Sequence, residues 1–175
     1  MSVLIVGFMC SGKSHIGRLV AQRLGLPHLD TDRLVEAEVG PLLPWMRLHG
    51  EVAFRERESA VLSRVLEGPP AVVSTGGGTP CEGDAMDRML RAGTVVYLDV
   101  PMDLLIERCA RKGGDRPLLF GLQGDTLAER VRSLMERRAP VYRRAQMHVH
   151  AADAPDVLAE RIAKALEPGY LDQVR

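Results

Sequence analysis

The segment from Gly7 to Ser14 carries the most specific chemical signal in this sequence. It reads Gly-Phe-Met-Cys-Ser-Gly-Lys-Ser and matches the pattern G-x-x-x-x-G-K-[ST]. Glycines let a backbone wrap closely around an anion, and successive amides together with the N-terminus of a following helix can bind it. In such loops the lysine, here Lys13, reaches the β- and γ-phosphates, and the hydroxyl, here that of Ser14, ligates Mg²⁺. The segment therefore predicts a site for the phosphates of a nucleoside triphosphate.

Two further groups of chemically useful residues directly follow apolar runs. Asp30 and Asp32 come after a short run that ends at Leu29, and Gly76–Gly78 comes after the run 71–75. A carboxylate just beyond a strand can orient a hydroxyl group, whereas three successive glycines lose backbone entropy on folding unless another group must approach closely. Asp30 or Thr31 also fits a plainer role as the N-cap of a following helix, and both interpretations stay open at this point.

Arginine supplies most of the positive charge, because all but three of the 23 basic residues are arginines. Its planar fork of donors suits bidentate binding of carboxylate and phosphate groups. The candidates are Arg55, which has Glu58 three residues later, Arg116 in a glycine-containing stretch, and Arg138. The plainer alternatives are an ordinary surface ion pair for Arg55 and a solvated basic face for Arg138.

Hydrophobic periodicity predicts alternating strands and helices around these residues. The predicted strands span residues 2–6, 27–30, 71–75, 94–100 and 146–150; the predicted helices are one that follows the phosphate loop and stops at Gly25, and those over 31–39, 50–66, 82–92, 102–112, 127–138 and 155–166. This alternation predicts an α/β fold with a parallel sheet covered on both faces. Ligands of such sheets bind beyond the carboxyl ends of the strands, where the candidate residues lie.

The composition limits the remaining classes of function. With 175 residues, of which 46% are hydrophobic, the chain can form one domain with a largely aliphatic core. Its 23 basic and 23 acidic side chains cancel, which gives no overall attraction to nucleic acid or anionic membranes. The three cysteines lack metal-site spacing, no apolar stretch reaches the roughly 18 residues of a membrane span, and the N-terminus does not resemble a signal peptide. We therefore expect a cytoplasmic protein without nucleic-acid or membrane partners.

The motifs, taken in their order along residues 1–145, resemble those of the shikimate kinases, small P-loop kinases related to the nucleoside monophosphate kinases. The resemblance rests on Gly7-Phe8-Met9, Asp30-Thr31-Asp32, Gly50-Glu51 with Phe54-Arg55 and Glu58, Gly76-Gly77-Gly78, Arg116-Pro117-Leu118-Leu119, and Arg138-Ala139-Pro140 with Tyr142. It implies a three-layer α/β/α P-loop kinase fold with a central five-stranded parallel sheet, formed by a single domain over residues 1–175. It also implies a small helical substrate-binding segment at about 31–62, a lid at about 112–125 and a monomeric enzyme.

The same resemblance implies that ATP, with Mg²⁺, donates a phosphoryl group to the 3-hydroxyl of shikimate. Lys13, Asp32 and Arg116 are the implied catalytic residues, Asp32 because it binds the acceptor hydroxyl and Arg116 because it covers the phosphates. The implied nucleotide-binding residues are Cys10, Ser11, Gly12, Lys13, Ser14, His15, Arg111, Arg116 and Pro155. The implied shikimate-binding residues are Asp32, Arg55, Glu58, Gly76, Gly77, Gly78 and Arg138, with Arg55 and Arg138 on the carboxylate. Ser14 and Asp30 are the implied Mg²⁺ residues.

The sequence departs from the family pattern at three places. His15 stands where threonine is common, Pro41 and Pro44 lie in the substrate-binding segment, and the segment 148–153 differs on the adenine side. Two other functions stay open here. A kinase for another small hydroxy acid, such as gluconate, would use the same arginine pair on its carboxylate. A nucleotide-dependent switch without turnover would use the phosphate loop alone.

Overall fold

The computed structural model describes residues 1–112 and 117–167, and these form five strands, seven α-helices and one short 3-10 helix. In chain order they are β1 (Ser2–Val6), α1 (Lys13–Leu24), β2 (His28–Asp30), α2 (Thr31–Val39), α3 (Leu42–Glu67), β3 (Val72–Ser74), η1 (Thr79–Cys81), α4 (Ala85–Ala92), β4 (Gly93–Asp99), α5 (Met102–Lys112), α6 (Gly124–Tyr142), β5 (Met147–His150) and α7 (Pro155–Leu166). Arg116, a predicted catalytic and nucleotide-binding residue, lies outside the described residues.

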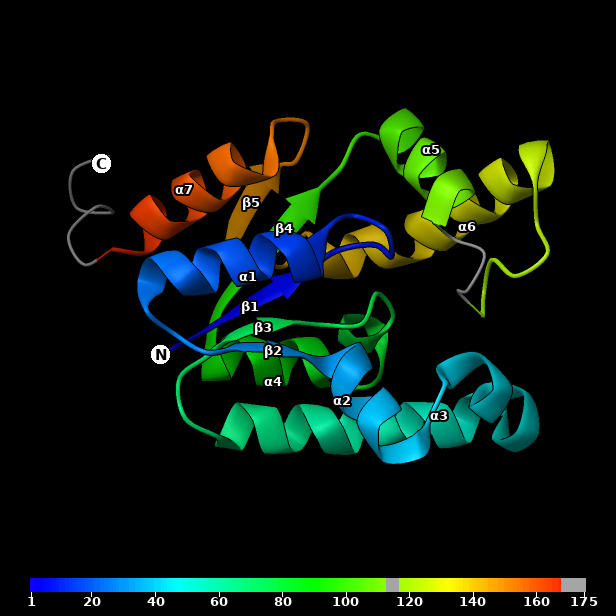
Figure 1. Ribbon diagram of the computed structural model, residues 1–175, viewed down its shortest axis with the longest axis horizontal. Coiled ribbons are helices and arrows are strands. Elements are labelled where there is room, and N and C mark those ends of the chain that lie inside the picture. Colours follow the sequence, from blue (N-terminus) through cyan, green and yellow to red (C-terminus); the bar gives the residue numbers. More distant parts are fainter. Residues whose placement is uncertain (113–116, 168–175) are drawn as a thin grey trace.

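The five strands form one parallel sheet in the order β2-β3-β1-β4-β5. In its centre, Val3 is paired with Val72 of β3 and with Thr94 of β4. Right-handed connections in this strand order place α1 and α7 on one face of the sheet and α3, α4 and α6 on the other. Figure 1 shows this arrangement, and α1 and α7 pack against each other. The predicted three-layer α/β/α fold is confirmed.

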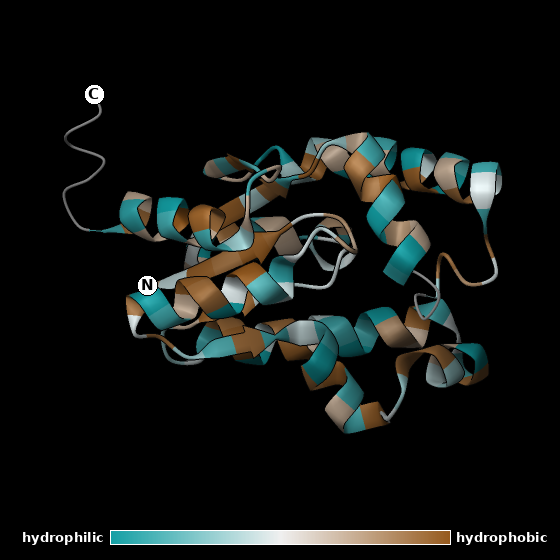
Figure 2. Ribbon diagram, turned by 45° about the horizontal axis from the view of Figure 1, so that its top comes forward, coloured by the Kyte–Doolittle hydropathy of each residue, from teal (hydrophilic) through white to brown (hydrophobic). Residues whose placement is uncertain are grey.

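The strands form where the sequence is apolar on both faces, because both faces of this sheet are covered. Leu4, Ile5 and Val6 of β1 are fully buried, as are Val72 and Val73 of β3. Figure 2 shows these strands in brown between helices whose outer sides are mostly teal. The covered sheet is a rigid support for the loops at the carboxyl ends of its strands.

The largest difference from the sequence-based prediction is the start of α3. We predicted a helix only over residues 50–66, but helical structure begins at Leu42. Pro44 is tolerated because it falls in the first turn of the helix, where its missing amide would have no partner. Gly50 then divides the element with a left-handed φ of 82°, which glycine adopts without steric strain. The segment predicted to bind the substrate therefore contains α2 and two further helical pieces that meet at Gly50.

Two other helix boundaries also differ. The predicted helix over residues 82–92 starts only at Ala85, because residues Thr79–Cys81 form a separate 3-10 turn. The predicted helix over 127–138 extends from Gly124 to Tyr142, with Pro140 inside its last turn. Among residues 1–112 and 117–167, no helix combines the length and apolar character that crossing a membrane requires.

Candidate active site

The parallel sheet brings the candidate residues together at the carboxyl edge of its strands. The phosphate loop follows β1, Asp30 ends β2, and Gly76 follows β3 by two residues. Since β2, β3 and β1 are adjacent and parallel, these three segments meet at one edge. Residues that directly follow these strands therefore lie close together, although they are far apart in the sequence.

The phosphate loop has the backbone geometry of an anion-binding nest. Positive φ angles occur at Gly7 (146°), Cys10 (62°) and Gly12 (97°), and α1 begins at Lys13. The buried Lys13 folds over the loop, and its Nζ donates hydrogen bonds to Gly7 O at 3.0 Å and Phe8 O at 2.8 Å. The lysine is therefore held against the loop by two of the loop's own carbonyl groups.

Each of the three successive glycines has a close neighbour, and for Gly77 that neighbour is backbone. A Cβ atom on Gly76 would lie 2.5 Å from Asp32 Oδ1, and one on Gly78 would lie 2.6 Å from Arg55 Nη1. A Cβ atom on Gly77 would lie 2.9 Å from the backbone nitrogen of Met9 in the phosphate loop. The glycines thus let the chain after β3 pack against both the phosphate loop and the candidate acceptor residues.

Gly77→Ala is expected to destabilise the protein by about 2 kcal/mol and to lower kcat, because backbone cannot yield as a flexible side chain can. Thermal unfolding and initial rates would measure both effects. Gly83→Ala is the control for a substitution without a clash: an added Cβ there meets nothing within 4 Å, so only its left-handed φ of 51° would lower stability, whereas the φ of Gly77 is not left-handed. A Gly77→Ala protein with the stability and kcat of Gly83→Ala would contradict this prediction.

Ser14, Asp30 and Asp32 line a single cavity of about 620 Å³. Asp30 has the capping role considered above, because its Oδ1 accepts a hydrogen bond from the Arg33 amide at 3.3 Å as the N-cap of α2. Asp30 can cap α2 and still offer an oxygen to the cavity, since a carboxylate has several lone pairs. Hydroxyl and carboxylate oxygens are the donors that Mg²⁺ prefers, so this wall fits the ion.

A second cavity, of about 270 Å³, adjoins the phosphate loop on the side of α5 and α7. Six predicted nucleotide-binding residues line it: Cys10, Ser11, Gly12, His15, Arg111 and Pro155. Sequence reasoning missed Arg108 and Lys112, which also line it. The sequence feature that could have identified Arg108 is its spacing of three residues from Arg111, because this spacing places both side chains on one face of a helix.

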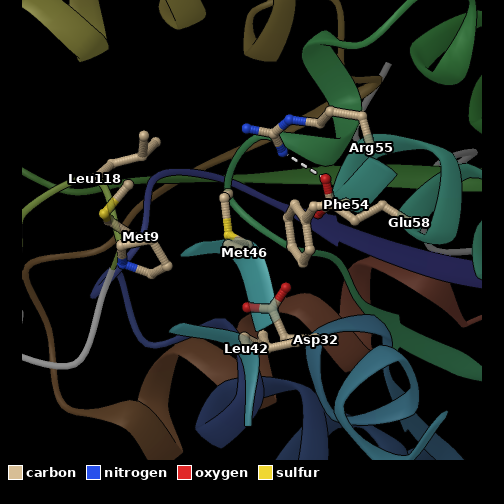
Figure 3. A pocket seen from close by; sticks show the side chains of 10 residues that line it. Met9, Asp32, Leu42, Met46, Phe54, Arg55, Glu58 and Leu118 are labelled. Atoms are coloured by element: carbon tan, nitrogen blue, oxygen red, sulfur yellow. Dashed lines mark hydrogen bonds and ion pairs between the residues drawn. The ribbon is translucent and has the colours of Figure 1, made fainter. Parts of the chain in front are cut away.

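A third, smaller cavity lies where the phosphate loop meets α2 and α3 (Figure 3). Its polar lining comes from Asp32, Arg55 and Glu58, as predicted, together with Gly77. Its apolar lining was not predicted and comprises Met9, Leu42, Met46, Phe54, Pro117 and Leu118. A small ligand with one charged end and an otherwise compact ring would suit such a site.

Arg55 is held by three carboxylates. It forms ion pairs with Glu51 at 3.0 Å, with Glu82 at 3.3 Å and, through Nη1, with the buried Glu58. Burial raises the pKa of Glu58, while Arg55 and a 2.7 Å hydrogen bond from Thr79 act in the opposite direction. This network fixes the guanidinium beside the small cavity, so Glu58 orients Arg55 rather than forming an ordinary surface pair with it.

Arg138 of α6 is a buried cation with unused hydrogen-bonding capacity. It is only 7% exposed, and its guanidinium lies 5.6 Å from the centre of the Phe8 ring. Its Nη1 is buried and lacks a hydrogen-bond partner, whereas the buried Nε of Arg55 lies 3.3 Å from Glu82 Oε1 without the geometry of a hydrogen bond. Burial raises the pKa of the Cys81 thiol to about 11, although the charges of Arg138 and Arg55 act in the opposite direction. A buried guanidinium with an unmatched donor is suited to an anion.

Comparison with known proteins identifies the family of this chain. The family model described as shikimate kinase matches residues 9–167. This chain belongs to the shikimate kinase family. It is therefore an enzyme, and the reaction of its family is the phosphorylation of shikimate with ATP as the phosphoryl donor.

Relatives within the family match over nearly their whole length. The shikimate kinase of Symbiobacterium thermophilum is 39% identical, over 97% of this chain and 98% of the relative. A solved shikimate kinase from Acinetobacter baumannii in complex with shikimate has a TM-score of 0.88 at 30% identity, covering 99% of this chain and 95% of that one. The shikimate kinase structure from Aquifex aeolicus has a TM-score of 0.83 at 33% identity, covering 98% of this chain and 99% of that one.

The gluconate alternative gains little from the comparisons. A gluconokinase from Sinorhizobium meliloti 1021 has a TM-score of 0.57 and 18% identity, covering 99% of this chain and 97% of that one. This likeness shows a shared fold alone. Shikimate kinases, in contrast, match in both sequence and structure.

Some of the residues predicted for the active site do not line any of the three cavities described above. Lys13, Gly76, Gly78 and Arg138 are not among the lining residues of the three cavities. Lys13 is folded onto the loop carbonyls, and the two glycines touch the residues that line the small cavity. The other predicted residues of the described chain do line a cavity, so their placement is consistent with the predicted grouping.

Proposed function

We propose that this chain transfers the γ-phosphoryl group of ATP to the 3-hydroxyl of shikimate, using the residues predicted above. The observation that carries the proposal is the wall of the small cavity, which combines Met9 of the phosphate loop with Asp32 and Arg55. An acceptor bound there would lie against the loop that holds the phosphates. Phosphoryl transfer is mainly positioning and charge stabilisation, and this adjacency supplies the positioning.

In this proposal Arg55 and Arg138 bind the carboxylate of shikimate. The unmatched buried Nη1 of Arg138 would gain a charged acceptor, which removes the free-energy penalty of leaving it unpaired, and Arg55 would add a second guanidinium. Glu58 holds Arg55 in place, and Gly76–Gly78 keep the backbone close without filling the space. The apolar residues Met46 and Phe54 would cover the ring of the acceptor and exclude water.

Asp32 is proposed to bind the reacting hydroxyl and to accept its proton. It lines both the small cavity and the larger cavity that contains Ser14 and Asp30, so it lies between the proposed acceptor and metal sites. A carboxylate in this position can orient the hydroxyl oxygen for in-line attack. The proton leaves the hydroxyl as the new bond to phosphorus forms.

The phosphates are proposed to bind the amides of the loop and the side chain of Lys13. Ser14 and Asp30 would hold Mg²⁺, Asp30 through water, and the ion would neutralise charge on the transferring group. Cys10, Ser11, Gly12, His15, Arg111 and Pro155 would line the nucleotide site, and Arg116 would cover the phosphates. We further propose a monomer, with a substrate-binding segment at about 31–62 and a lid at about 112–125; light scattering would test the mass.

Arg138→Met is expected to raise the KM for shikimate by about 30- to 100-fold, because the substrate carboxylate loses a buried charged donor. Initial rates at saturating ATP would measure this change, with the KM for ATP expected to stay within about threefold. The neighbouring Arg137→Met removes the same charge from an exposed position and is the matched control. Equal shikimate KM values in the two variants would refute the proposed role of Arg138.

The proposed reaction can be tested by ADP release with shikimate, gluconate and nucleoside monophosphates as acceptors. Saturable turnover with shikimate, and much slower turnover with the others, is the expected result. Turnover with gluconate and none with shikimate would overturn the proposal. ATP binding without turnover on any acceptor would favour a nucleotide-dependent switch instead.

A further inference from the structure

A side chain from α5 contacts the phosphate loop from outside the proposed acceptor site. Arg108 is half-buried, and its Nη1 donates a hydrogen bond to the backbone carbonyl of Ser11 at 3.2 Å. Together with Arg111 it also lines the cavity of about 270 Å³ beside the phosphate loop, which we call the nucleotide cavity. We propose that Arg108 is a nucleotide-positioning residue that sets the orientation of the phosphate loop. The inference rests on the proposed function, because it assumes that the loop binds ATP.

The geometry of the peptide bond explains how this contact would act. The described residues contain no cis peptide bonds, and in a trans peptide the C=O and the following N–H point in opposite directions. Arg108 therefore holds the Ser11 carbonyl on its own side and directs the Gly12 amide to the opposite side. Gly12 has a φ of 97°, and its amide is part of the nest that would surround the phosphates. The hydrogen bond thus prepares a phosphate donor before ATP arrives.

Charge adds a second contribution. Arg108, Arg111 and Lys112 all line the nucleotide cavity, and Asp153 is the acid among its lining residues. A nucleoside triphosphate carries several negative charges, so a cation beside the loop favours binding by Coulomb attraction. Arginine combines this charge with a fixed, planar set of donors, which lysine cannot reproduce.

A purely structural alternative predicts different behaviour. Arg108 lies near the C-terminal end of α5, where cations are generally favourable because of the helix dipole. If this were its only role, replacing Arg108 would lower thermal stability and affect both substrates alike. A nucleotide-positioning role predicts a selective loss of nucleotide affinity instead.

The test compares Arg108→Met, Arg108→Lys and the control Arg91→Met. Arg91 is exposed in the last turn of α4, directly before the amino end of β4, and therefore lies at the edge of the sheet opposite the site. Calorimetric titration with ADP would give nucleotide affinity, and initial rates would give both KM values. For Arg108→Met we expect about tenfold weaker ADP binding and a tenfold higher KM for ATP, with the shikimate KM within twofold. Arg108→Lys should recover part of this loss, and Arg91→Met should match the unmodified protein.

Each outcome bears on one proposal. ADP affinity of Arg108→Met within twofold of the unmodified protein would overturn the role of Arg108. A parallel rise of both KM values with a lower unfolding temperature would also overturn it, in favour of the structural role. Calorimetry needs no turnover, so the ADP result stands even if shikimate is not phosphorylated, and that separate failure would count against the proposed function only.

Discussion

Lys13→Met is expected to lower kcat by about 10³-fold, the largest effect of any single substitution considered. The phosphoryl group gains charge on its outer oxygens during transfer, and a preorganised cation at that point stabilises the transition state more than the bound ATP. Lys13 is already held beside the loop by its hydrogen bonds to Gly7 O and Phe8 O. Methionine keeps much of the side-chain length but removes both the charge and the donors.

The measurement is ADP release at saturating ATP and shikimate, together with calorimetric binding of ATP. Lys164→Met is the matched control, because Lys164 is paired with Glu160 in the exposed last turn of α7. We expect the control to retain full kcat, and Lys13→Met to bind ATP less tightly as well as turning over slowly. A kcat within tenfold of the unmodified protein would show that Lys13 does not stabilise the transition state.

Asp32→Asn is expected to lower kcat by about 10²- to 10³-fold, with a much smaller change in the shikimate KM. Asparagine has nearly the same shape and can still hydrogen-bond the acceptor hydroxyl, but it cannot accept the proton, and general-base contributions are commonly of this size. The side chain is tightly placed, since a Cβ atom on Gly76 would meet its Oδ1. An isosteric change should therefore leave the surrounding packing intact.

Steady-state kinetics with shikimate as the varied substrate would separate the two contributions of Asp32. Asp84→Asn is the control, because Asp84 lies on the surface at the start of α4. A rise in KM with unchanged kcat would mean that Asp32 binds the acceptor without taking its proton. A variant indistinguishable from Asp84→Asn would remove Asp32 from the site altogether.

Much of the fold could be predicted from the sequence, because strand and helix signals are local. The run Ser2–Val6 is apolar at every position that faces a covering helix, and Gly25 ends α1 in a left-handed conformation, as expected for a helix C-terminus. The phosphate loop is equally local, since its positive φ angles arise within eight consecutive residues. Its place between a strand and a helix could therefore be inferred before any tertiary contact was known.

The start of α3 could not be predicted in the same way, because local preferences compete there. Pro41 and Pro44 indicate a loop, and Gly50 indicates a break, yet helical structure begins at Leu42. Leu42 and Met46 line the small cavity, and packing there stabilises a helical piece that is too short to be stable alone. The part of the predicted acceptor segment from Leu42 to His49 therefore depends on tertiary packing.

The contacts that combine the loop with the rest of the site also depend on the tertiary structure. The close approach of Gly77 to Met9, the hydrogen bond from Arg108 to Ser11, and the buried position of Arg138 join residues far apart in the chain. No local pattern encodes such pairs, because they follow from how successive crossovers stack helices on the sheet. The sequence by itself determined which residues could bind phosphate and carboxylate, and the packing of α2, α3 and α5 around the phosphate loop decided which of them share a cavity.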